Sequence, residues 1–302
     1  MTRTKWIAVI AAFLGLVAVS ALAIEGQQGC GNQTEASGCT RVLFIGNSYT
    51  YVNDLPAMFA ELARSGGHRV ETGMVAVGGS TLAEHAASAT TAATISSAKW
   101  DLIVLQEQSQ VPSVDQLRQT QMYPAARRLA DTIYRQGARP VFFLTWAHRD
   151  GWPENGLPDY ASMQSAVDDG YLAIAAEEQA AVAPVGVAWA TALSQPHPAL
   201  WQDDGSHPTT AGTYIAACVF YATIFRQSPR GFAYHADLSA VDAAILQTVA
   251  TETVLGDPGK WGPALASGNR RQGGEAAGLR RRLVSGLALS GYELPGAAHV
   301  DA

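Results

Sequence analysis

The chain has 302 residues, of which 48% are hydrophobic and 15% charged, and its formal net charge at pH 7 is −6. A chain of this length can bury a substantial core in one large domain or two small ones. The negative charge argues against a nucleic-acid-binding protein, because such a protein needs a basic face that neutralises phosphates.

The first 24 residues have the layout of an export signal. Arg3 and Lys5 precede an uncharged run over residues 6–24, and the Ala-Leu-Ala sequence at 21–23 offers a cleavage site. The apolar run is also long enough to span a bilayer, so an uncleaved membrane anchor is the alternative. We therefore expect an exported protein that is secreted, periplasmic or attached to the cell envelope. Its membrane contact would be limited to this segment, if the segment stays attached.

Two cysteines, Cys30 and Cys39, lie in a Gly-, Ser- and Asn-rich linker over residues 25–40. Export to an oxidising compartment favours a disulfide between them, which would fasten the linker to the first predicted strand. The alternative is two free thiols in a flexible linker. Cys218 lies in an apolar helical segment and is expected in the core.

After the linker, short apolar runs alternate with longer helical segments. Strands are predicted at 41–45, 70–77, 102–106, 141–146 and 182–188, and helices at 54–65, 114–136, 160–181, 210–225 and 239–255. Continuous apolar strands separated by helices predict a parallel sheet covered on both faces. We therefore expect a three-layer α/β/α fold of flavodoxin-like organisation with about five strands, and ligands bound beyond the carboxyl ends of those strands.

From about residue 257 onward this pattern gives way to a Gly- and Arg-rich extension that ends at residue 302. Arg270, Arg271 and the three arginines at 280–282 make the extension basic. A disordered or loosely docked tail is one interpretation, and contact with an anionic envelope surface is the other. The predicted folded domain therefore spans residues 41–256.

A serine stands directly after the first predicted strand, in the turn Gly46-Asn47-Ser48-Tyr49-Thr50. A serine at a strand-to-helix junction can point its hydroxyl into a cleft. Its own N–H and the start of the following helix can then face a developing negative charge. Taken alone, such a turn is more often only structural.

A second polar segment lies far downstream, at residues 203–208. A neutral serine needs an adjacent base, and that base needs a third group to fix its tautomer. Asp204 and His207 can supply both parts from one loop, with Asp203 as the alternative orienting group. Together with the early serine, they predict a catalytic triad of Ser48, His207 and Asp204.

Four segments resemble the sequence blocks of the SGNH (GDSL) hydrolases, in the right order and at predicted strand ends. They are the turn at 46–50, the Gly-Ser-Thr sequence at 79–81, residues 105–109 and the Asp-x-x-His sequence at 204–207. The first block usually reads Gly-Asp-Ser-x-Thr, and Asn47 here replaces its Asp. An Asn at that position can still form local hydrogen bonds.

The resemblance implies an oxyanion hole made by the backbone N–H groups of Ser48 and Gly79 and by a side-chain amide. The third block of the family, Gly-x-Asn-Asp, supplies an Asn for this purpose. Gln108 stands in its place and carries the same amide donor on a stem one methylene longer. Gln106, at the position of the glycine in that block, is the competing candidate. Both amides could instead merely tie strand-end loops together.

Several other side chains follow predicted strands and could line the mouth of the cleft. His148 and Arg149 could contact a polar substrate, and Trp152 could stack on a sugar ring. A solvated loop anchored by the tryptophan is the alternative. Asn47 and Gln106 are further candidate substrate contacts.

Three titratable residues near these motifs are expected to have ordinary structural roles. His85 and His197 are interpreted as surface or helix histidines. Glu107 is expected to cap or salt-link the loop after the third strand.

The resemblance implies a serine esterase that works through an acyl-enzyme and needs neither a metal nor a cofactor. Its carbohydrate-esterase branches suggest a short acyl group, such as acetate on an envelope or environmental glycan, as the substrate. Two alternatives stay open at this point. One is a non-catalytic glycan-binding module on the same fold, and the other is a lipase or thioesterase for longer acyl chains.

Overall fold

A computed structural model of the chain describes Cys30 and residues 38–265. The predicted export segment and the basic part of the C-terminal extension lie outside the described residues. Among the residues that are described, none of the helices has both the length and the apolar character needed to cross a membrane.

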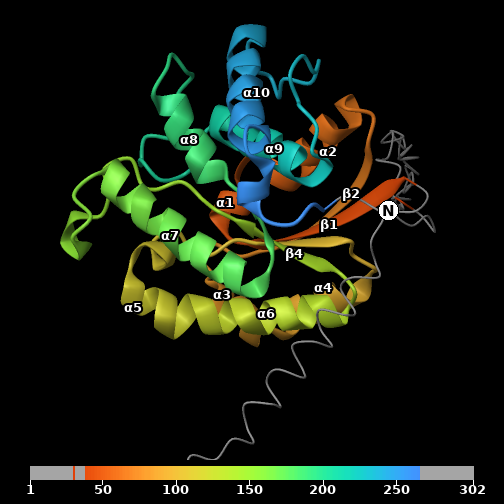
Figure 1. Cartoon of the computed structure of the whole chain (residues 1–302), viewed down its shortest axis with the longest axis vertical. Helices are drawn as coiled ribbons and strands as arrows, with labels where there is room; N and C mark the ends of the chain where they lie inside the picture. The colour runs from red at the N-terminus through yellow and green to blue at the C-terminus, as the bar shows by residue number, and fades with distance from the viewer. Residues whose placement is uncertain (1–29, 31–37, 266–302) are drawn as a thin grey trace, which may run out of the picture.

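The described chain is organised around a five-stranded parallel sheet with the strand order β2-β1-β3-β4-β5 (Figure 1). Its strands are β1 (Cys39–Gly46), β2 (Arg69–Ala76), β3 (Leu102–Leu105), β4 (Arg139–Phe143) and β5 (Ala181–Ala183). All four residues of the central strand β3 are buried, as expected of a parallel strand covered on both faces. The strand order reverses direction at β1, and a crevice opens at such a switch point beyond the carboxyl ends of the strands.

Two layers of helices cover the sheet (Figure 1). One face carries α2 (Leu55–Ser65), α8 (Val185–Leu193), α9 (Thr210–Phe225) and α10 (Ala240–Leu255). The other carries α3 (Leu82–Ala87), α4 (Ala89–Ser97), α5 (Asp115–Leu117), α6 (Tyr123–Arg135) and α7 (Tyr160–Glu178). The short helix α1 (Ser48–Tyr51) begins just beyond the end of β1. The architecture is the predicted three-layer α/β/α fold.

Helix α9 shows how the sequence determines this packing. Its residues are almost all apolar or small, and every one from Ala211 to Ile224 is buried. A helix that is apolar on all sides must lie inside the protein, and α9 packs against both α2 and α10. Thr209 caps its first turn by accepting a hydrogen bond from the Gly212 N–H at 3.2 Å.

The fifth strand is shorter than the sequence predicts. The apolar run at 182–188 was expected to form one strand, but β5 ends at Ala183 and helix α8 begins at Val185. Pro184 separates the two elements, since it cannot donate a backbone hydrogen bond to a sheet. Helices α3 and α4 were not predicted at all, although Thr81 and Glu84 form a capping box at the start of α3.

The folded domain extends beyond the predicted boundary at residue 256. Residues 258–261 form the short helix η6 (Pro258–Trp261), and the side chains of Trp261 and Leu265 are only 2% and 3% exposed. Arg139 and Arg226 donate hydrogen bonds to backbone carbonyls of this segment. The first nine residues of the extension are therefore docked on the domain.

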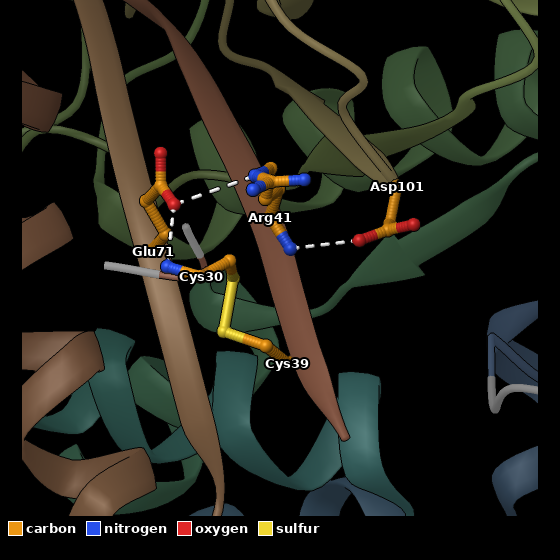
Figure 2. The surroundings of a disulfide bond; sticks show 5 residues. All are labelled: Cys30, Cys39, Arg41, Glu71 and Asp101. Atoms are coloured by element: carbon orange, nitrogen blue, oxygen red, sulfur yellow. Dashed lines mark hydrogen bonds and ion pairs between the residues drawn. A yellow bond between two sulfur atoms is a disulfide. The ribbon is translucent and has the colours of Figure 1, made fainter. Parts of the chain in front are cut away.

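A disulfide joins Cys30 to Cys39, the first residue of β1 (Figure 2). The Cys30 N–H donates a hydrogen bond to the Glu71 carboxylate on β2 at 2.7 Å, and Arg41 on β1 pairs with the same oxygen at 3.3 Å. The bridge thus fastens the linker to the amino-terminal ends of β1 and β2. The sulfur of Cys218 lies in the core, where its residue is 0% exposed.

Candidate active site

The predicted site residues meet at the carboxyl edge of the sheet. Ser48 follows β1, Gly79 follows β2, Gln108 follows β3 and His148 follows β4, while His207 lies on the loop before α9. All five line one open cleft of about 350 Å³. The remaining lining residues are Asn47, Tyr49, Tyr51, Gly78, Ser109 and Ser206.

Ser48, His207 and Asp204 form a continuous chain of hydrogen bonds. The Asp204 carboxylate lies 2.6 Å from Nδ1 of His207, and Nε2 of the same ring lies 2.9 Å from the Ser48 hydroxyl oxygen. Because Nδ1 donates its proton to the carboxylate, Nε2 is left as an acceptor for the Ser48 proton. The side chain of the alternative orienting group, Asp203, takes no part in this chain.

The Asp204 carboxylate is held by its own loop. Its other oxygen accepts the backbone N–H groups of Ser206 and His207, each at 2.9 Å. Desolvation raises the pKa of Asp204, but the hydrogen bonds from the His207 ring and from these two N–H groups outweigh it and lower the pKa to about 2. Asp204 is therefore ionised at neutral pH, as a group that stabilises an imidazolium must be.

Aromatic residues fix the loop that carries His207. The Tyr49 hydroxyl is hydrogen-bonded to the Ser206 hydroxyl at 2.7 Å, and the Trp146 indole donates to the Ser206 carbonyl at 2.9 Å. The Tyr49 ring stacks on Trp146 with a centroid distance of 4.5 Å and presents an edge to His207. Burial raises the pKa of Tyr49 to about 12, so its hydroxyl stays protonated. The neighbours of the nucleophile and of the base are thus bonded to each other.

The nucleophile loop is held by the amide of Gln106. The amide oxygen accepts the Asn47 N–H at 2.8 Å and the Thr50 hydroxyl at 2.9 Å, and the amide nitrogen donates to the Asn47 side chain at 2.9 Å and to the Glu107 carbonyl at 2.6 Å. A side chain on Gly46 would collide with this amide, because an added Cβ would overlap its oxygen. Gln106 is buried with both amide hydrogens already donated, so it is neither an oxyanion donor nor a substrate contact.

The side chain of Asn47 is likewise engaged in structural hydrogen bonds. Its amide donates to the Ser80 carbonyl at 3.0 Å and its side-chain oxygen accepts the Tyr49 N–H at 3.1 Å, which caps α1. It borders the cleft but is only 3% exposed. The Asn that replaces the usual Asp of the first block therefore links the nucleophile loop to the loop after β2.

Three donors remain available at the cleft for an oxyanion. Within residues 38–265, the backbone N–H groups of Ser48 and Gly79 donate to no acceptor. Gly79 has a φ of +73°, a left-handed conformation that favours glycine. The Gln108 oxygen accepts the N–H groups of Gln110 and Val111, whereas its amide nitrogen makes only long contacts of 3.4 Å. Of the two candidate amides, Gln108 is the one at the cleft.

Of the three candidate contacts after β4, His148, Arg149 and Trp152, His148 alone lines the cleft. Its Nε2 shares a hydrogen bond of 2.9 Å with the Ser109 hydroxyl, and burial lowers the pKa of the ring. Trp152 does not line the cleft, because it is half-buried against the core and pairs with Leu157. Arg149 does not line the cleft, and its guanidinium contacts Asp150 at 3.3 Å and the Asp203 carbonyl at 3.5 Å.

The two histidines that were given ordinary structural roles, His85 and His197, differ in burial and in their hydrogen-bond partners. His85 was expected at the surface of the protein or on a helix, and it lies on helix α3 but is only 3% exposed. Its Nε2 donates to the Gly46 carbonyl at 2.8 Å, two residues before Ser48, and burial lowers its pKa. His197 is half-buried and bonds the neighbouring Pro198 carbonyl, away from the cleft.

Glu107 caps a helix, as expected, but forms no salt link with any of the described residues. One of its carboxylate oxygens accepts the N–H of Leu82, the first residue of α3, at 3.0 Å. Nowhere in the described part of the chain do three or more His, Cys, Asp or Glu side chains group in a way that could hold a metal ion.

No protein-family model and no curated protein matches this chain by sequence. Solved structures do match. A protein from Slackia heliotrinireducens that is assigned to the SGNH hydrolases is 30% identical, and the match covers 61% of this chain and 97% of that chain with a TM-score of 0.52. A DUF4886 family protein from Bacteroides uniformis is 18% identical, with 72% and 95% coverage and a TM-score of 0.63, which shows the shared fold. The identity over nearly the whole Slackia protein shows that this chain belongs to the SGNH hydrolase family.

Proposed function

We propose that the chain is an exported serine esterase that hydrolyses carboxylic esters with Ser48 as the nucleophile. The observation that carries this proposal is the hydrogen-bonded sequence from Ser48 through His207 to Asp204, with distances of 2.9 and 2.6 Å. The first distance lies within the range over which a base can take a proton from a nucleophile, and the second is a hydrogen bond that orients the base.

The proposed reaction has two halves. His207 removes the proton from Ser48 as the serine oxygen attacks the ester carbonyl, and it then gives that proton to the departing alcohol. Asp204 stabilises the imidazolium that forms in between. Water, deprotonated by the same ring, hydrolyses the acyl-enzyme and regenerates the serine.

The developing negative charge on the carbonyl oxygen needs donors that are already in place. We assign this role to the backbone N–H groups of Ser48 and Gly79 and to the Gln108 amide, which all border the cleft. The loss of one such donor in related chemistry raises the barrier by about 3–4 kcal/mol.

The lining of the cleft supports a short acyl ester of a polar alcohol, with an acetylated glycan as the best candidate. Ser109, Ser206 and His148 offer hydroxyl and imidazole groups, whereas Tyr51, which is 41% exposed, offers an aromatic face. Hydroxyl partners combined with an exposed ring suit a sugar better than a long acyl chain, which needs an extended apolar groove.

Labelling with a fluorophosphonate, followed by turnover of p-nitrophenyl esters, tests the proposal. We expect an adduct on Ser48, no adduct and no turnover in Ser48→Ala, and unchanged labelling in Ser96→Ala, whose serine is exposed on α4. Undiminished turnover by Ser48→Ala would refute the mechanism. A wild-type protein without an adduct would favour the glycan-binding module instead.

The same ester series identifies the acyl group. We expect the highest kcat/KM with p-nitrophenyl acetate and a steady decline through butyrate, octanoate and palmitate. A maximum at octanoate or palmitate would favour the lipase or thioesterase alternative.

Export is part of the proposal and rests on two features. The first 24 residues have the layout of a signal peptide or anchor, and the pairing of Cys30 with Cys39 suits an oxidising compartment. Fractionation of cells that produce the full chain should recover it outside the cytoplasm. Recovery of the reduced, full-length chain from the cytoplasm would contradict this.

A further inference from the structure

A buried carboxyl group stands one residue before Gln108, which lines the cleft, and the proposed reaction does not use it. Glu107 follows β3 and is 0% exposed. Glutamates are almost never fully buried unless they are paired, because the loss of water around a carboxylate costs several kcal/mol. No Lys, Arg or His of the described chain forms an ion pair with it.

One oxygen of Glu107 joins two loops. Its Oε1 accepts the N–H of Leu82 at 3.0 Å and the N–H of Gln108 at 2.7 Å. The Glu107 N–H in turn donates to the Tyr171 hydroxyl of α7 at 2.9 Å, which fixes the main chain at this point. The main chain of Glu107 is thus anchored to α7, while its carboxyl group connects the loop after β2 with the loop after β3.

These two loops carry two of the three proposed oxyanion donors. Leu82 is three residues beyond Gly79, and Gln108 is itself the residue with the amide donor. An oxyanion hole works only when its donors are held in place before the reaction, within a few tenths of an ångström. The contact between the two loops through Glu107 is therefore suited to set the distance between Gly79 and Gln108.

We propose that Glu107 is a positioning residue of the oxyanion hole, whose buried Oε1 holds the Gly79 loop and the Gln108 loop at a fixed separation. The inference rests on the proposed esterase function. It assigns Glu107 no contact with the substrate. The residue acts through the backbone groups that it binds.

Replacement of Glu107 by glutamine should preserve this role, because only one of the two carboxyl oxygens binds the loops. Oε2 is buried and has no partner among the described residues. Burial raises the pKa of Glu107 to about 7, opposed by the Gln108 and Leu82 N–H groups and supported by the nearby charge of Glu84 on α3. The other titratable group that faces it is Tyr171 on α7. A neutral glutamine therefore keeps the acceptor oxygen that binds both loops.

Kinetics of Glu107→Gln and Glu107→Leu, with p-nitrophenyl acetate as the substrate, test this inference. We expect Glu107→Leu to lose at least about 100-fold in kcat with KM within about threefold, because only transition-state binding is affected. Its affinity for a trifluoromethyl ketone, which forms a tetrahedral adduct on Ser48, should fall in parallel. Glu107→Gln should keep kcat within about fivefold of the wild type.

A matched control separates positioning from stability. Gln247 on α10 is also buried and binds the Gly231 N–H, the Tyr214 hydroxyl and the Phe232 carbonyl, none of which borders the cleft. Gln247→Leu should lower the melting temperature and leave the kcat of the folded protein unchanged. If Glu107 were merely structural, Glu107→Leu would behave in the same way.

Each outcome decides the inference. A folded Glu107→Leu variant with wild-type kcat overturns it, and so does a Glu107→Gln variant as inactive as the leucine variant. If the leucine variant does not fold, Glu107→Asp serves instead: its shorter stem keeps the acid but withdraws the oxygen, so unchanged kcat would overturn the inference. A wild-type protein without Ser48-dependent turnover overturns the proposed function as well, which distinguishes the two failures.

Discussion

The amide of Gln106 gives the sharpest prediction about stability. Three of its four hydrogen bonds tie the end of β3 to the loop that carries Ser48, and the fourth goes to the neighbouring Glu107 carbonyl. Gln106→Leu has a similar volume and removes all four bonds at once. The Asn47 N–H and the Thr50 hydroxyl would then lose the acceptor that the amide oxygen provides.

The expected loss of stability follows from these contacts. Four hydrogen bonds at about 1 kcal/mol each give about 4 kcal/mol. The buried Asn47 N–H, left without its acceptor, adds about 1–3 kcal/mol, and the apolar leucine side chain in a site that is 0% exposed returns about 2 kcal/mol. We therefore expect Gln106→Leu to lower the free energy of unfolding by about 4 kcal/mol, or the melting temperature by about 8–16 °C.

Urea and thermal unfolding, monitored by circular dichroism, measure this difference. Gln116→Leu is the matched control, because Gln116 is exposed on α5 and a surface substitution should change stability by less than about 0.5 kcal/mol. A Gln106→Leu protein that unfolds within about 1 kcal/mol of the wild type would refute the assignment of this amide as the support of the nucleophile loop.

Three further predictions concern pH, the base loop and the disulfide. The pKa of Glu107 is about 7 in the folded protein against a reference value of 4.5, so the carboxyl group of the unfolded chain loses its proton at a lower pH. The folded state therefore loses stability as the pH rises from 4.5 to about 7, by about 3 kcal/mol in total. Glu107→Gln should remove that loss when urea midpoints at pH 5 and pH 8 are compared, and equal pH slopes would contradict the reasoning. Tyr49→Phe and Ser206→Ala should each reduce kcat/KM about tenfold. The double variant should lose no more than either single variant, because both substitutions remove the same hydrogen bond, and additive losses would contradict this reasoning. Replacement of Cys30 and Cys39 by serine should cost roughly 2–3 kcal/mol for a sequence separation of 9 and leave kcat unchanged, because the bridge lies at the opposite edge of the sheet; an unchanged urea midpoint would disprove this.

Much of the fold could be predicted because its elements carry strong local signals. The strands are short apolar runs, and α9 begins and ends at the predicted residues, 210 and 225. The run at 182–188 was assigned wrongly because a short apolar segment has no periodicity that separates a strand from a buried helix. Pro184 was the one local signal that could have divided it.

The candidate site was predictable in part for the same reason. Ser48, Asp204 and His207 each lie in a short motif whose residue types already point to a role. The supports of the site could not be found in this way, because Tyr49 and Ser206 are hydrogen-bonded across a separation of 157 residues. Such pairs depend on the tertiary arrangement of loops, which no local pattern encodes.

The surroundings of the three residues that follow β3 explain why the sequence could not decide between Gln106 and Gln108 as the oxyanion donor. Each of the three serves a different part of the site. Gln106 binds the nucleophile loop after β1, Glu107 binds the start of α3 after β2, and Gln108 borders the cleft. Strand β3 lies between β1 and β4 in the sheet, so the chain that leaves it can reach the loops of several strands. Two chemically identical amides two residues apart therefore acquire different roles from the groups that the tertiary fold brings next to each of them. By this reasoning, Gln106→Leu should destabilise the protein more than Gln108→Leu, which removes only the two hydrogen bonds that the Gln108 amide oxygen accepts. Gln108→Leu should in turn reduce kcat about 100-fold. The reverse pattern would exchange the two assignments.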